Sequence, residues 1–305
     1  MSMNILKYCA DKFYRLLARL IDRHCRFLSD RQYAGLMFRA NMGYWMDWDS
    51  PKTYNEKLQW LKVFYHDPLW TKLVDKYEVK DYVAKAIGTE YIIPTLGVWN
   101  SFNEIDFDKL PNQFVLKCTH DSGGLVICKD KSSLDIDNAR KKITRSLSFN
   151  YYWRSREWPY KNVKPRIIAE QYMEDSQTAE LRDYKIFAFD GKVKALFVAS
   201  DRNKKGEEVK FDYFDENFNH LDLRQAHPMA NKKIAKPVNF EKMKELAAKL
   251  SQGLPEARCD FYEVDGKVYF GEITFFHHGG NVAFHPSSWD EVFGSWIKLP
   301  SEKMI

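Results

Sequence analysis

The spacing of apolar residues along the chain changes after Gly88. Residues 53–87 repeat apolar side chains at the three- and four-residue intervals of a helix, and Thr53 with Glu56 three positions later forms the pattern of a helix cap. After Pro94 the apolar residues gather into short runs of the kind found in buried strands. The runs from which we predict strands are 113–118, 125–128 and 166–173.

Two later segments each contain the sequence Asp-Gly-Lys-Val. It lies between β-rich runs in residues 184–198 and again in residues 259–274, and Asp-Gly in that position is the strongest short signal for a β-hairpin. Between them, residues 239–252 have the apolar spacing of an amphipathic helix. Helices followed by a β-rich block and a hairpin–helix–hairpin unit predict an α+β fold, not a doubly wound parallel sheet.

The composition is that of a globular protein. Of the 305 residues, 45% are hydrophobic and 29% are charged, which excludes disordered, collagen-like and membrane-spanning classes. The five cysteines are odd in number and widely spaced, so we expect neither a disulfide framework nor a zinc ribbon. No apolar run approaches the roughly 18 residues of a membrane span, and charges interrupt the N-terminal segment where a signal peptide would be apolar. We therefore expect a cytoplasmic protein.

The net charge of +5 is unevenly distributed. Residues 1–28 carry six basic and two acidic side chains, with apolar residues at helical spacing, so they predict an amphipathic helix packed either on the domain or on anionic lipid at the inner face of the plasma membrane. Residues 139–166 carry nine basic side chains and one acidic one, interleaved with aromatic residues. This second stretch is either a solvated helix and loop or a site for an anionic sugar or glycan. Because the remaining chain is acidic overall, we do not expect nucleic-acid binding.

Charged residues interrupt several of the predicted strands. They are Lys117, Lys185, Arg258, Asp260 and Glu272. Each alone could lie on the solvated face of an antiparallel sheet, but together they indicate a site. With a three-residue loop in the last hairpin, strand alternation places Arg258, Asp260 and Glu272 on one face, whereas a two-residue loop would separate the two carboxylates. The sequence leaves both loop lengths open, and the three-residue loop predicts a carboxylate pair.

Two adjacent carboxylates repel each other unless a cation lies between them. Hard oxygen ligands of this kind suit Mg²⁺, which commonly takes one or two carboxylates plus substrate phosphates. Residues 120–124, with the sequence HDSGG, form a glycine-containing turn whose backbone N–H groups could approach phosphate oxygens. The turn is not a Walker A loop, and no GxGxxG sequence occurs in the chain.

Taken in order, these segments resemble the TupA-like ATP-grasp family, which is named for teichuronopeptide biosynthesis and occurs in bacterial cell-surface polysaccharide loci. The similar segments are 55–83, 92–99, 114–124, 165–173, 183–193 and 258–275. The resemblance implies an ATP-grasp fold, in which two α+β subdomains grip ATP, with an N-terminal helical extension. The implied division is 1–50 for the extension, 51–110 for a helical region, 111–173 for the small lid subdomain and 174–305 for the large subdomain.

The resemblance also implies roles for individual residues. Around the nucleotide it places Lys76 and Lys117 at the phosphates, Ser122, Gly123 and Gly124 in a closing loop, Glu170 at the adenine amino group, and Gln171, Tyr172 and Met173 in the hinge. At the reacting groups it places Asp260, Glu272 and Thr274 as magnesium ligands, Arg258 at the transferring phosphoryl group and Lys185 near phosphate or substrate. Toward the substrate we expect Arg202, His277, His278 and Gly279. Thr274 stands where the family has asparagine, so one ligand is a weaker hydroxyl oxygen.

ATP-grasp ligases use ATP and Mg²⁺ to join a carboxylate to an amine through an acyl phosphate. By resemblance we expect an amino acid or amine to be joined to a uronic acid or similar sugar in capsule, O-antigen or other lipopolysaccharide biosynthesis. Some family members carry the label glycosyltransferase, so transfer of a sugar is one alternative. A sugar or lipid kinase that uses the same ATP site is another, and a membrane-surface binding module led by residues 1–28 is a third.

Overall fold

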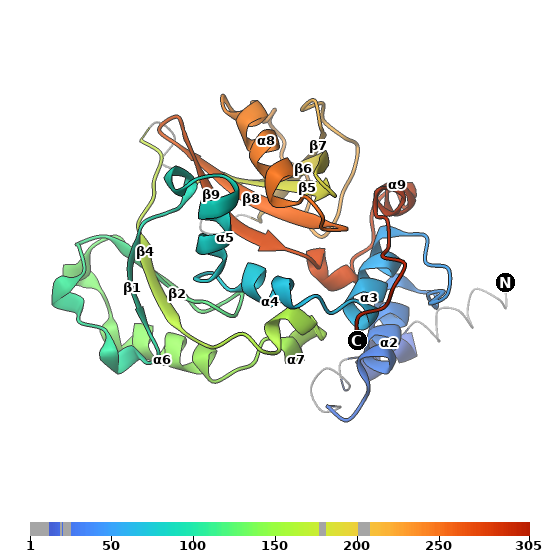
Figure 1. Cartoon of the computed structure of the whole chain (residues 1–305), viewed down its shortest axis with the longest axis horizontal. Coiled ribbons are helices and arrows are strands. Elements are labelled where there is room, and N and C mark those ends of the chain that lie inside the picture. Colours follow the sequence, from blue (N-terminus) through green and yellow to red (C-terminus); the bar gives the residue numbers. More distant parts are fainter. Residues whose placement is uncertain (1–11, 19, 21–25, 177–180, 201–207) are drawn as a thin grey trace.

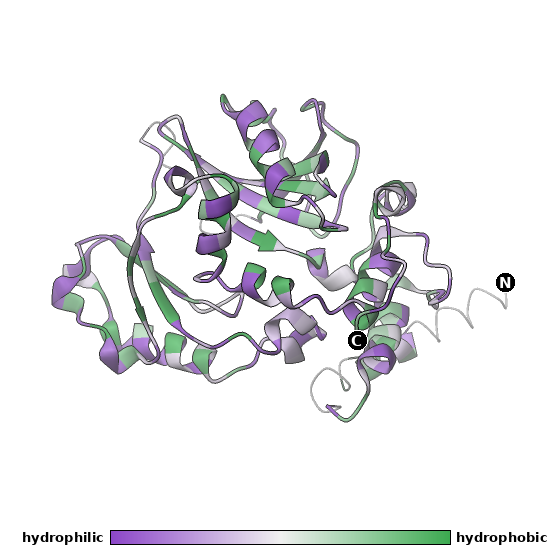
Figure 2. Ribbon diagram, viewed as in Figure 1, coloured by the Kyte–Doolittle hydropathy of each residue, from purple (hydrophilic) through white to green (hydrophobic). Residues whose placement is uncertain are grey.

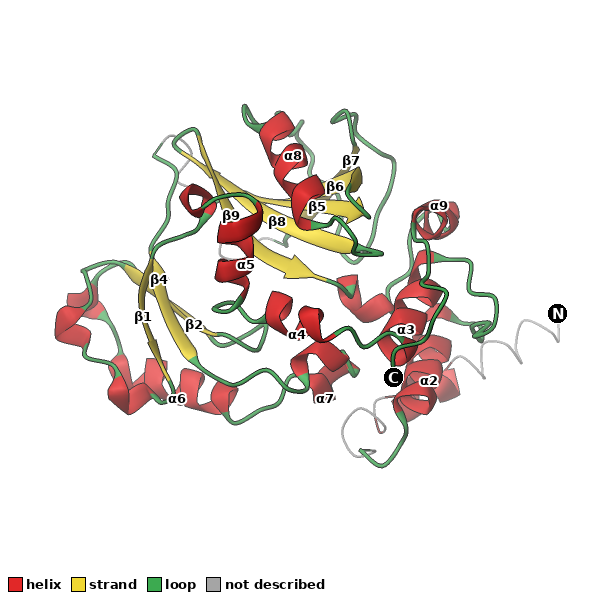
Figure 3. Cartoon of the chain, viewed as in Figure 1, coloured by secondary structure: helices red, strands yellow, loops and turns green. Residues whose placement is uncertain are grey.

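The computed structural model describes residues 12–18, 20, 26–176, 181–200 and 208–305 (Figure 1). The described residues form two antiparallel sheets, drawn in yellow in Figure 3, with helices around them. This architecture confirms the predicted α+β class. The small sheet has the order β1-β4-β2-β3, with strands β1 (Thr95–Trp99), β2 (Phe114–Cys118), β3 (Leu125–Cys128) and β4 (Ile167–Gln171). The large sheet has the order β7-β6-β5-β8-β9, with strands β5 (Asp183–Phe189), β6 (Lys192–Ser200), β7 (Lys210–Asp215), β8 (Ala257–Val264) and β9 (Lys267–Thr274).

Helix α6 (Ile136–Leu147) covers one face of the small sheet. Its Ile143 joins Phe114 and Leu116 of β2 in a buried cluster, because alternate residues of that strand point toward the helix. Lys117 lies between these positions and therefore points to the opposite face. The packing of α6 thus decides which face of the small sheet is left for polar groups.

Helix α8 (Phe240–Leu250) packs in the same way against β5, β6 and β8 of the large sheet. The helix is purple and green along its length in Figure 2, as its amphipathic spacing predicts. Leu246 and Leu250 are buried in the main core together with Ile186 and Cys259 from the sheet. The opposite face of this sheet carries the charged residues.

The predicted helix over residues 53–87 is three helices in the structure. They are α3 (Tyr54–Phe64), α4 (Pro68–Val74) and α5 (Val79–Ala86). The capping box of Thr53 and Glu56 at the start of α3 is present as predicted. Asp67 caps α4, which begins at a proline, and the carboxylate of Asp75 accepts from backbone N–H groups ahead of α5. These two aspartates are the local reason for the breaks. Other α-helices in the described part of the chain include α2 (Asp30–Met42), α7 (Tyr152–Ser155) and α9 (Ser288–Trp296).

Both Asp-Gly hairpins are confirmed, and the last one has the two-residue loop, not the three-residue one. Asp265 and Gly266 form a two-residue turn with φ of 49° and 74°, as a tight hairpin turn of this class requires. The ladder then shifts register between Asp260 and Phe261, so that Gly271 is an extra residue in β9. Because of this bulge, Asp260 still lies directly opposite Glu272, and the predicted carboxylate pair shares one face.

The N-terminal segment predicted as an amphipathic helix lies partly outside the described residues. Within the described part, residues 12–18 are helical, and Phe13, Leu16 and Phe27 are exposed. Tyr14 packs edge-on against Trp45. In the part of the chain that the structure describes, no helix is long and apolar enough to cross a bilayer. Binding of this segment to anionic lipid stays a prediction.

A buried carboxyl group between α3 and β8 gives a test of the packing. Glu256 is fully buried, accepts a hydrogen bond of 2.9 Å from the Tyr54 hydroxyl at Oε1, and has no hydrogen-bond partner at Oε2. Burial therefore raises the pKa of Glu256 well above its ordinary value. A carboxyl with a raised pKa in the folded state stabilises the fold only at low pH, and this contribution is lost as the pH rises.

We expect Glu256→Gln to raise the free energy of unfolding at pH 8 by at least about 1.4 kcal/mol, the equivalent of one pKa unit. The gain should shrink as the pH falls through 4.5 to about 3, because the carboxyl of the native sequence is then protonated in the unfolded chain as well as in the fold. Denaturant unfolding at several pH values measures this difference. The exposed Glu302→Gln is the control, and a gain that does not depend on pH would contradict the assignment.

Candidate active site

A charged row crosses three adjacent strands of the large sheet. The register places Lys185 of β5 opposite Asp260 of β8, and Asp260 opposite Glu272 of β9. The ammonium group of Lys185 donates to Asp260 and also lies 2.7 Å from a carboxylate oxygen of Asp183. Burial raises the pKa of Asp260, and the charges of Arg258 and Lys185 oppose that effect. The three residues predicted on separate segments therefore form one continuous site.

Arg258 binds this row together. Its Nε and Nη2 atoms donate to the two oxygens of Asp260 at 2.7 and 2.8 Å, a bidentate pair that fixes both groups. The same Nη2 lies 3.2 Å from Glu272 Oε1 and 3.0 Å from Thr274 Oγ1. One buried guanidinium thus contacts all three predicted magnesium ligands.

His277 lies behind Arg258 and is almost fully buried. Its Nδ1 is 3.0 Å from Arg258 Nη1, and because arginine only donates, this nitrogen is the acceptor. The proton is then on Nε2, which faces the Tyr213 hydroxyl at 3.5 Å, and that hydroxyl donates to Gln225 at 3.2 Å. Burial lowers the pKa of His277 well below its ordinary value, so the ring is neutral and orients the guanidinium.

A second charged cluster lies on the small sheet. Glu170 of β4 is held by two ammonium groups, with Lys80 Nζ 2.6 Å from Oε1 and Lys117 Nζ 2.6 Å from Oε2. Burial tends to raise the pKa of Glu170, but the two cations outweigh it and lower the pKa below its ordinary value. Lys80 also donates to the carbonyl of Ile93 at 2.8 Å and to the Thr95 hydroxyl at 2.9 Å, which joins α5 to the start of β1.

The glycine-containing loop is anchored at one end and open at the other. The Asp121 carboxylate accepts from the N–H of Gly124 at 3.0 Å and from the Ser146 hydroxyl of α6, while Lys76 donates to the Asp121 carbonyl. A Cβ added at Gly124 would lie 2.5 Å from Ser146 Oγ, so only glycine fits there. A Cβ at Gly123 would meet nothing within 4 Å. The loop can therefore admit a ligand at Ser122 and Gly123 without losing its anchor.

A cavity of about 390 Å³ is lined by Arg258, Glu272 and Thr274 of the large sheet together with Lys76 and Ser122. Asp260, Lys185 and the cluster around Glu170 are not part of its lining. The Glu272 side chain is 42% exposed, whereas that of Asp260 is 1% exposed. Burial tends to raise the pKa of Glu272, but four cations drawn from both sheets and the loop between α4 and α5 outweigh it and lower the pKa to about 2. Those cations are Lys185, Lys76, Arg258 and Lys117.

A family model described as TupA-like ATPgrasp matches residues 56–298, which include every strand of both sheets. The chain belongs to the TupA-like ATP-grasp family. This confirms the resemblance seen in the sequence and the ATP-grasp fold that it implied. No curated protein matches the chain significantly.

Comparison with solved structures finds only distant similarity to this family member. The chain is 15% identical to D-alanine–D-alanine ligase from Bacillus anthracis in complex with ATP, covering 67% of this chain and 55% of that one with a TM-score of 0.39. For L-amino acid ligase from Bacillus licheniformis the identity is 13%, the coverage is 74% and 49%, and the TM-score is 0.46. For N5-carboxyaminoimidazole synthetase from Staphylococcus aureus the identity is 12%, the match covers 76% of this chain and 54% of that one, and the TM-score is 0.40. The TupA-like chain thus spans about half the length of these proteins.

The other predicted residues of the ATP-grasp site lie at its margins. In the predicted hinge, the N–H of Gln171 donates to the Pro94 carbonyl at 3.0 Å, the Tyr172 ring lies 5.5 Å from Lys129 Nζ, and Met173 is half-buried. His278 and Gly279 line the cavity, and burial lowers the pKa of His278 to about 4. Arg202 lies outside the described residues.

Two charged residues at the candidate site were not predicted from the sequence. Lys80 lies in α5, whereas Lys76 lies in the loop before that helix, so no helical spacing links the two lysines and the sequence contains no clear signal for Lys80. Glu157 is the one acidic residue in the basic stretch 139–166, and its buried carboxylate lines the cavity 2.6 Å from the Ser155 hydroxyl. Burial raises the pKa of Glu157, against the opposing charge of Lys62.

The donor atoms of the cavity fit a magnesium ion. Thr274 Oγ1 lies 3.4 Å from Glu272 Oε1, and both belong to the hard oxygen ligands that Mg²⁺ accepts. Among the described residues, no group of three or more His, Cys, Asp and Glu side chains forms a complete metal site. A magnesium ion here would therefore need oxygens from a substrate and water to complete its shell, as is usual at phosphate sites.

The pairing of Glu170 gives a pH-dependent test. We expect Lys80→Ala to lower the free energy of unfolding by about 1.5–3 kcal/mol at pH 7, since a buried carboxylate loses a charged hydrogen bond. Because the pKa of Glu170 is lowered in the folded state, its ionisation stabilises the fold above its ordinary pKa, and this is lost as the pH falls. The difference from the native chain should therefore shrink at pH 3. Lys85→Ala, on the exposed side of α5, is the control, and equal losses at both pH values would refute the pairing.

The two glycines of the loop should respond differently to the same change. Gly124→Ala should lower the free energy of unfolding by about 1–3 kcal/mol, the usual cost of overpacking, because its Cβ would collide with Ser146 and Cys118. Gly123→Ala should leave stability unchanged within error. Thermal unfolding of the two variants makes the comparison, and equal effects would mean that the anchor described here is wrong.

Proposed function

We propose that the protein is an ATP- and Mg²⁺-dependent carboxylate–amine ligase. The observation that carries the proposal is the cavity in which the carboxylate of Glu272 lies with the cations Arg258 and Lys76. The charges of Lys185 and Lys117 add to theirs and lower the pKa of Glu272 to about 2. Cations beside an exposed, ionised carboxylate suit a triphosphate with its magnesium ion. Family membership supports ATP as the nucleotide.

In this proposal the nucleotide lies between the two sheets. Lys76 and Lys117 bind its phosphates, the loop of Ser122, Gly123 and Gly124 covers them, and Glu170 accepts from the adenine amino group. Glu272 and Thr274, with Asp260, hold magnesium, which when bound neutralises phosphate charge. Arg258 and Lys185 keep these carboxylates in place and face the transferring group.

The proposed reaction has two steps. A carboxylate oxygen of the acid attacks the γ-phosphorus of ATP, the bond from that phosphorus to the β,γ-bridging oxygen breaks, and ADP leaves. The nitrogen of the amine then attacks the acyl carbon, the bond to the phosphate oxygen breaks, and inorganic phosphate leaves. Glu157 lines the cavity and has a raised pKa, so we assign it the proton that the amine nitrogen loses. Placement and charge neutralisation supply the rest of the catalysis.

The proposal extends to the chemical class of the two substrates. We infer that the acid is a uronic acid or a similar anionic sugar, that the amine is an amino acid or a small amine, and that the product enters a bacterial cell-surface polysaccharide. The family name and the basic stretch 139–166 support this inference. Binding of residues 1–28 to anionic lipid would bring the enzyme to the membrane where such polymers are assembled.

The test is a screen of the purified protein with ATP, Mg²⁺, uronic acids and amino acids. We expect ADP release that requires both an acid and an amine, and an amide product detected by mass spectrometry. Glu272→Gln should reduce the rate at least about 100-fold and remove the extra thermal stabilisation that Mg²⁺ adds to ATP. Exposed Glu291→Gln is the matched control and should change neither.

Other outcomes would identify the alternatives. Phosphate retained on a sugar or lipid product would identify a kinase. Sugar transfer from a nucleotide sugar without ATP would identify a glycosyltransferase; against this, Asp135 of the Asp-x-Asp sequence at 135–137 caps α6 by accepting from Asn138 N at 2.9 Å. Full activity in Glu272→Gln would refute the ligase site altogether.

A further inference from the structure

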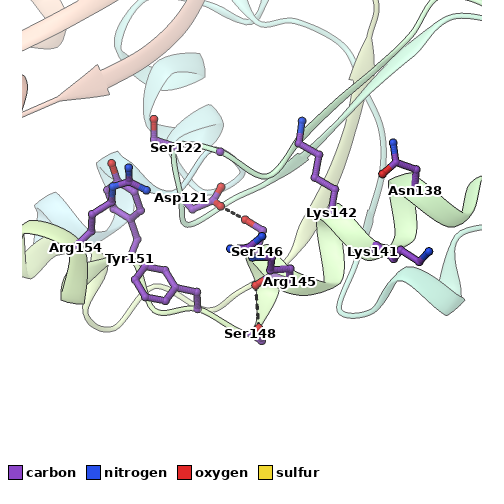
Figure 4. Close-up of a pocket in the computed structure, with 12 residues that line it drawn as sticks. Asp121, Ser122, Asn138, Lys141, Lys142, Arg145, Ser146, Ser148, Tyr151 and Arg154 are labelled. Atoms are coloured by element: carbon purple, nitrogen blue, oxygen red, sulfur yellow. Dashed lines mark hydrogen bonds between the residues drawn. The ribbon is translucent and has the colours of Figure 1, made fainter. Parts of the chain in front are cut away.

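A larger cavity, of about 820 Å³, lies beside the lid helix α6 (Figure 4). Lys141, Lys142 and Arg145 of α6 line it on one side, and Arg154 lines it on the other. In Figure 4, Lys142 and Arg154 extend on either side of the loop that carries Ser122. We refer to this cavity as the lid groove.

The lid groove has a positive charge that the described protein does not neutralise. The side chains of its four cations make no ion pair among the described residues, whereas Arg140 on the same helix contacts Asn103 and lies 4.8 Å from the ring of Phe102. The acidic residue at the groove, Asp121, accepts hydrogen bonds from Gly124 and Ser146, and its charge offsets one of the four cations, so the lining keeps a net positive charge. Four like charges around one space repel each other, and an anion placed among them removes that cost.

The lid groove continues into the proposed active site. Asp121, Ser122, Tyr151 and Arg154 line both the groove and the 390 Å³ cavity that contains Glu272. A ligand chain lying in the groove can therefore extend past Ser122 and present its end beside Glu272. Since Gly123 has open space around its Cα, the loop does not block this path.

The lining of the groove favours a sugar over a nucleic acid. Phe149 is 40% exposed there, and Tyr151, Ser148 and Asn138 add a second ring and polar groups that suit sugar faces and hydroxyls. A volume of about 820 Å³ holds a ligand of a few sugar units. Nucleic-acid binding would require a broad basic face, and the chain outside its two basic stretches is acidic overall.

We propose that the lid groove binds an acidic oligosaccharide, a short sugar chain bearing carboxylates or phosphates, whose end reaches the ATP-dependent site. The proposal rests on the proposed ligase function only in saying that the end of the sugar chain reacts. Binding of the chain in the groove does not depend on catalysis. The groove makes the enzyme selective for a charged chain over a single charged sugar.

The experiment measures binding of fluorescently labelled hexagalacturonate to the full-length protein by polarisation, in low and moderate salt. The competitors are unlabelled hexagalacturonate, monomeric galacturonate, neutral maltohexaose, a phosphorylated oligosaccharide and a single-stranded DNA of equal charge. The triple variant Lys141→Glu/Lys142→Glu/Arg145→Glu reverses the groove charge but leaves Arg154, which also lines the active-site cavity. The control reverses the same number of exposed lysines elsewhere, namely Lys232, Lys233 and Lys267.

We expect the native chain to bind the hexasaccharide at least tenfold more tightly than the monomer, with maltohexaose unable to compete. The groove variant should lose at least tenfold in affinity while its thermal stabilisation by ATP and Mg²⁺ stays unchanged, and the control variant should bind as the native chain does. Competition by the phosphorylated oligosaccharide would support the proposal and show that phosphates, as well as carboxylates, are bound. Equal competition by DNA, no binding by the native chain, or equal loss in the control would overturn it. If the native chain binds the oligosaccharide but does not bind ATP, the ligase function is refuted and the proposal for the groove is supported.

Discussion

The pairing of Arg258 with Asp260 is the interaction on which the rest of the site depends. Both side chains are buried, and their two hydrogen bonds of 2.7 and 2.8 Å leave the guanidinium edge to contact Glu272 and Thr274. Removing one partner of such a buried pair costs about 3–5 kcal/mol, because the other charge remains without compensation. The sheet therefore holds its carboxylates together by an internal cation, and His277 fixes that cation from behind.

The arrangement of two sheets explains how one carboxylate stays ionised within a crowded site. Glu272 belongs to the large sheet, Lys117 to the small sheet, and Lys76 to the loop between α4 and α5. Their charges reach one another only because α6 and α8 cover the outer faces, which leaves the polar face of each sheet toward the other elements (Figure 1). The packing of a helix on one face of each sheet thus determines which face carries the charged side chains.

Much of this fold could be predicted from local signals. The capping box at Thr53, the two Asp-Gly turns and the amphipathic α8 all follow from residue types at fixed spacing, and all are present. Strands β1 and β7 were missed because neither has a long apolar run or a strong turn beside it. The charges predicted within strands, apart from Lys117, do lie together in the large sheet. The pairing of Lys80 with Glu170 depends on how α5 lies relative to β4, which no local pattern reports.

Because of the bulge at Gly271, the geometry of the site depends on how many residues separate the hairpin turn from Glu272. From the Asp265–Gly266 turn to Glu272, the number of positions must have the parity that brings Glu272 to the face of Asp260. A point substitution in that stretch changes one side chain, whereas a one-residue insertion or deletion would turn every later side chain of β9 to the other face. Between the turn and Glu272, β9 is therefore constrained more strictly in its length than in its residue types.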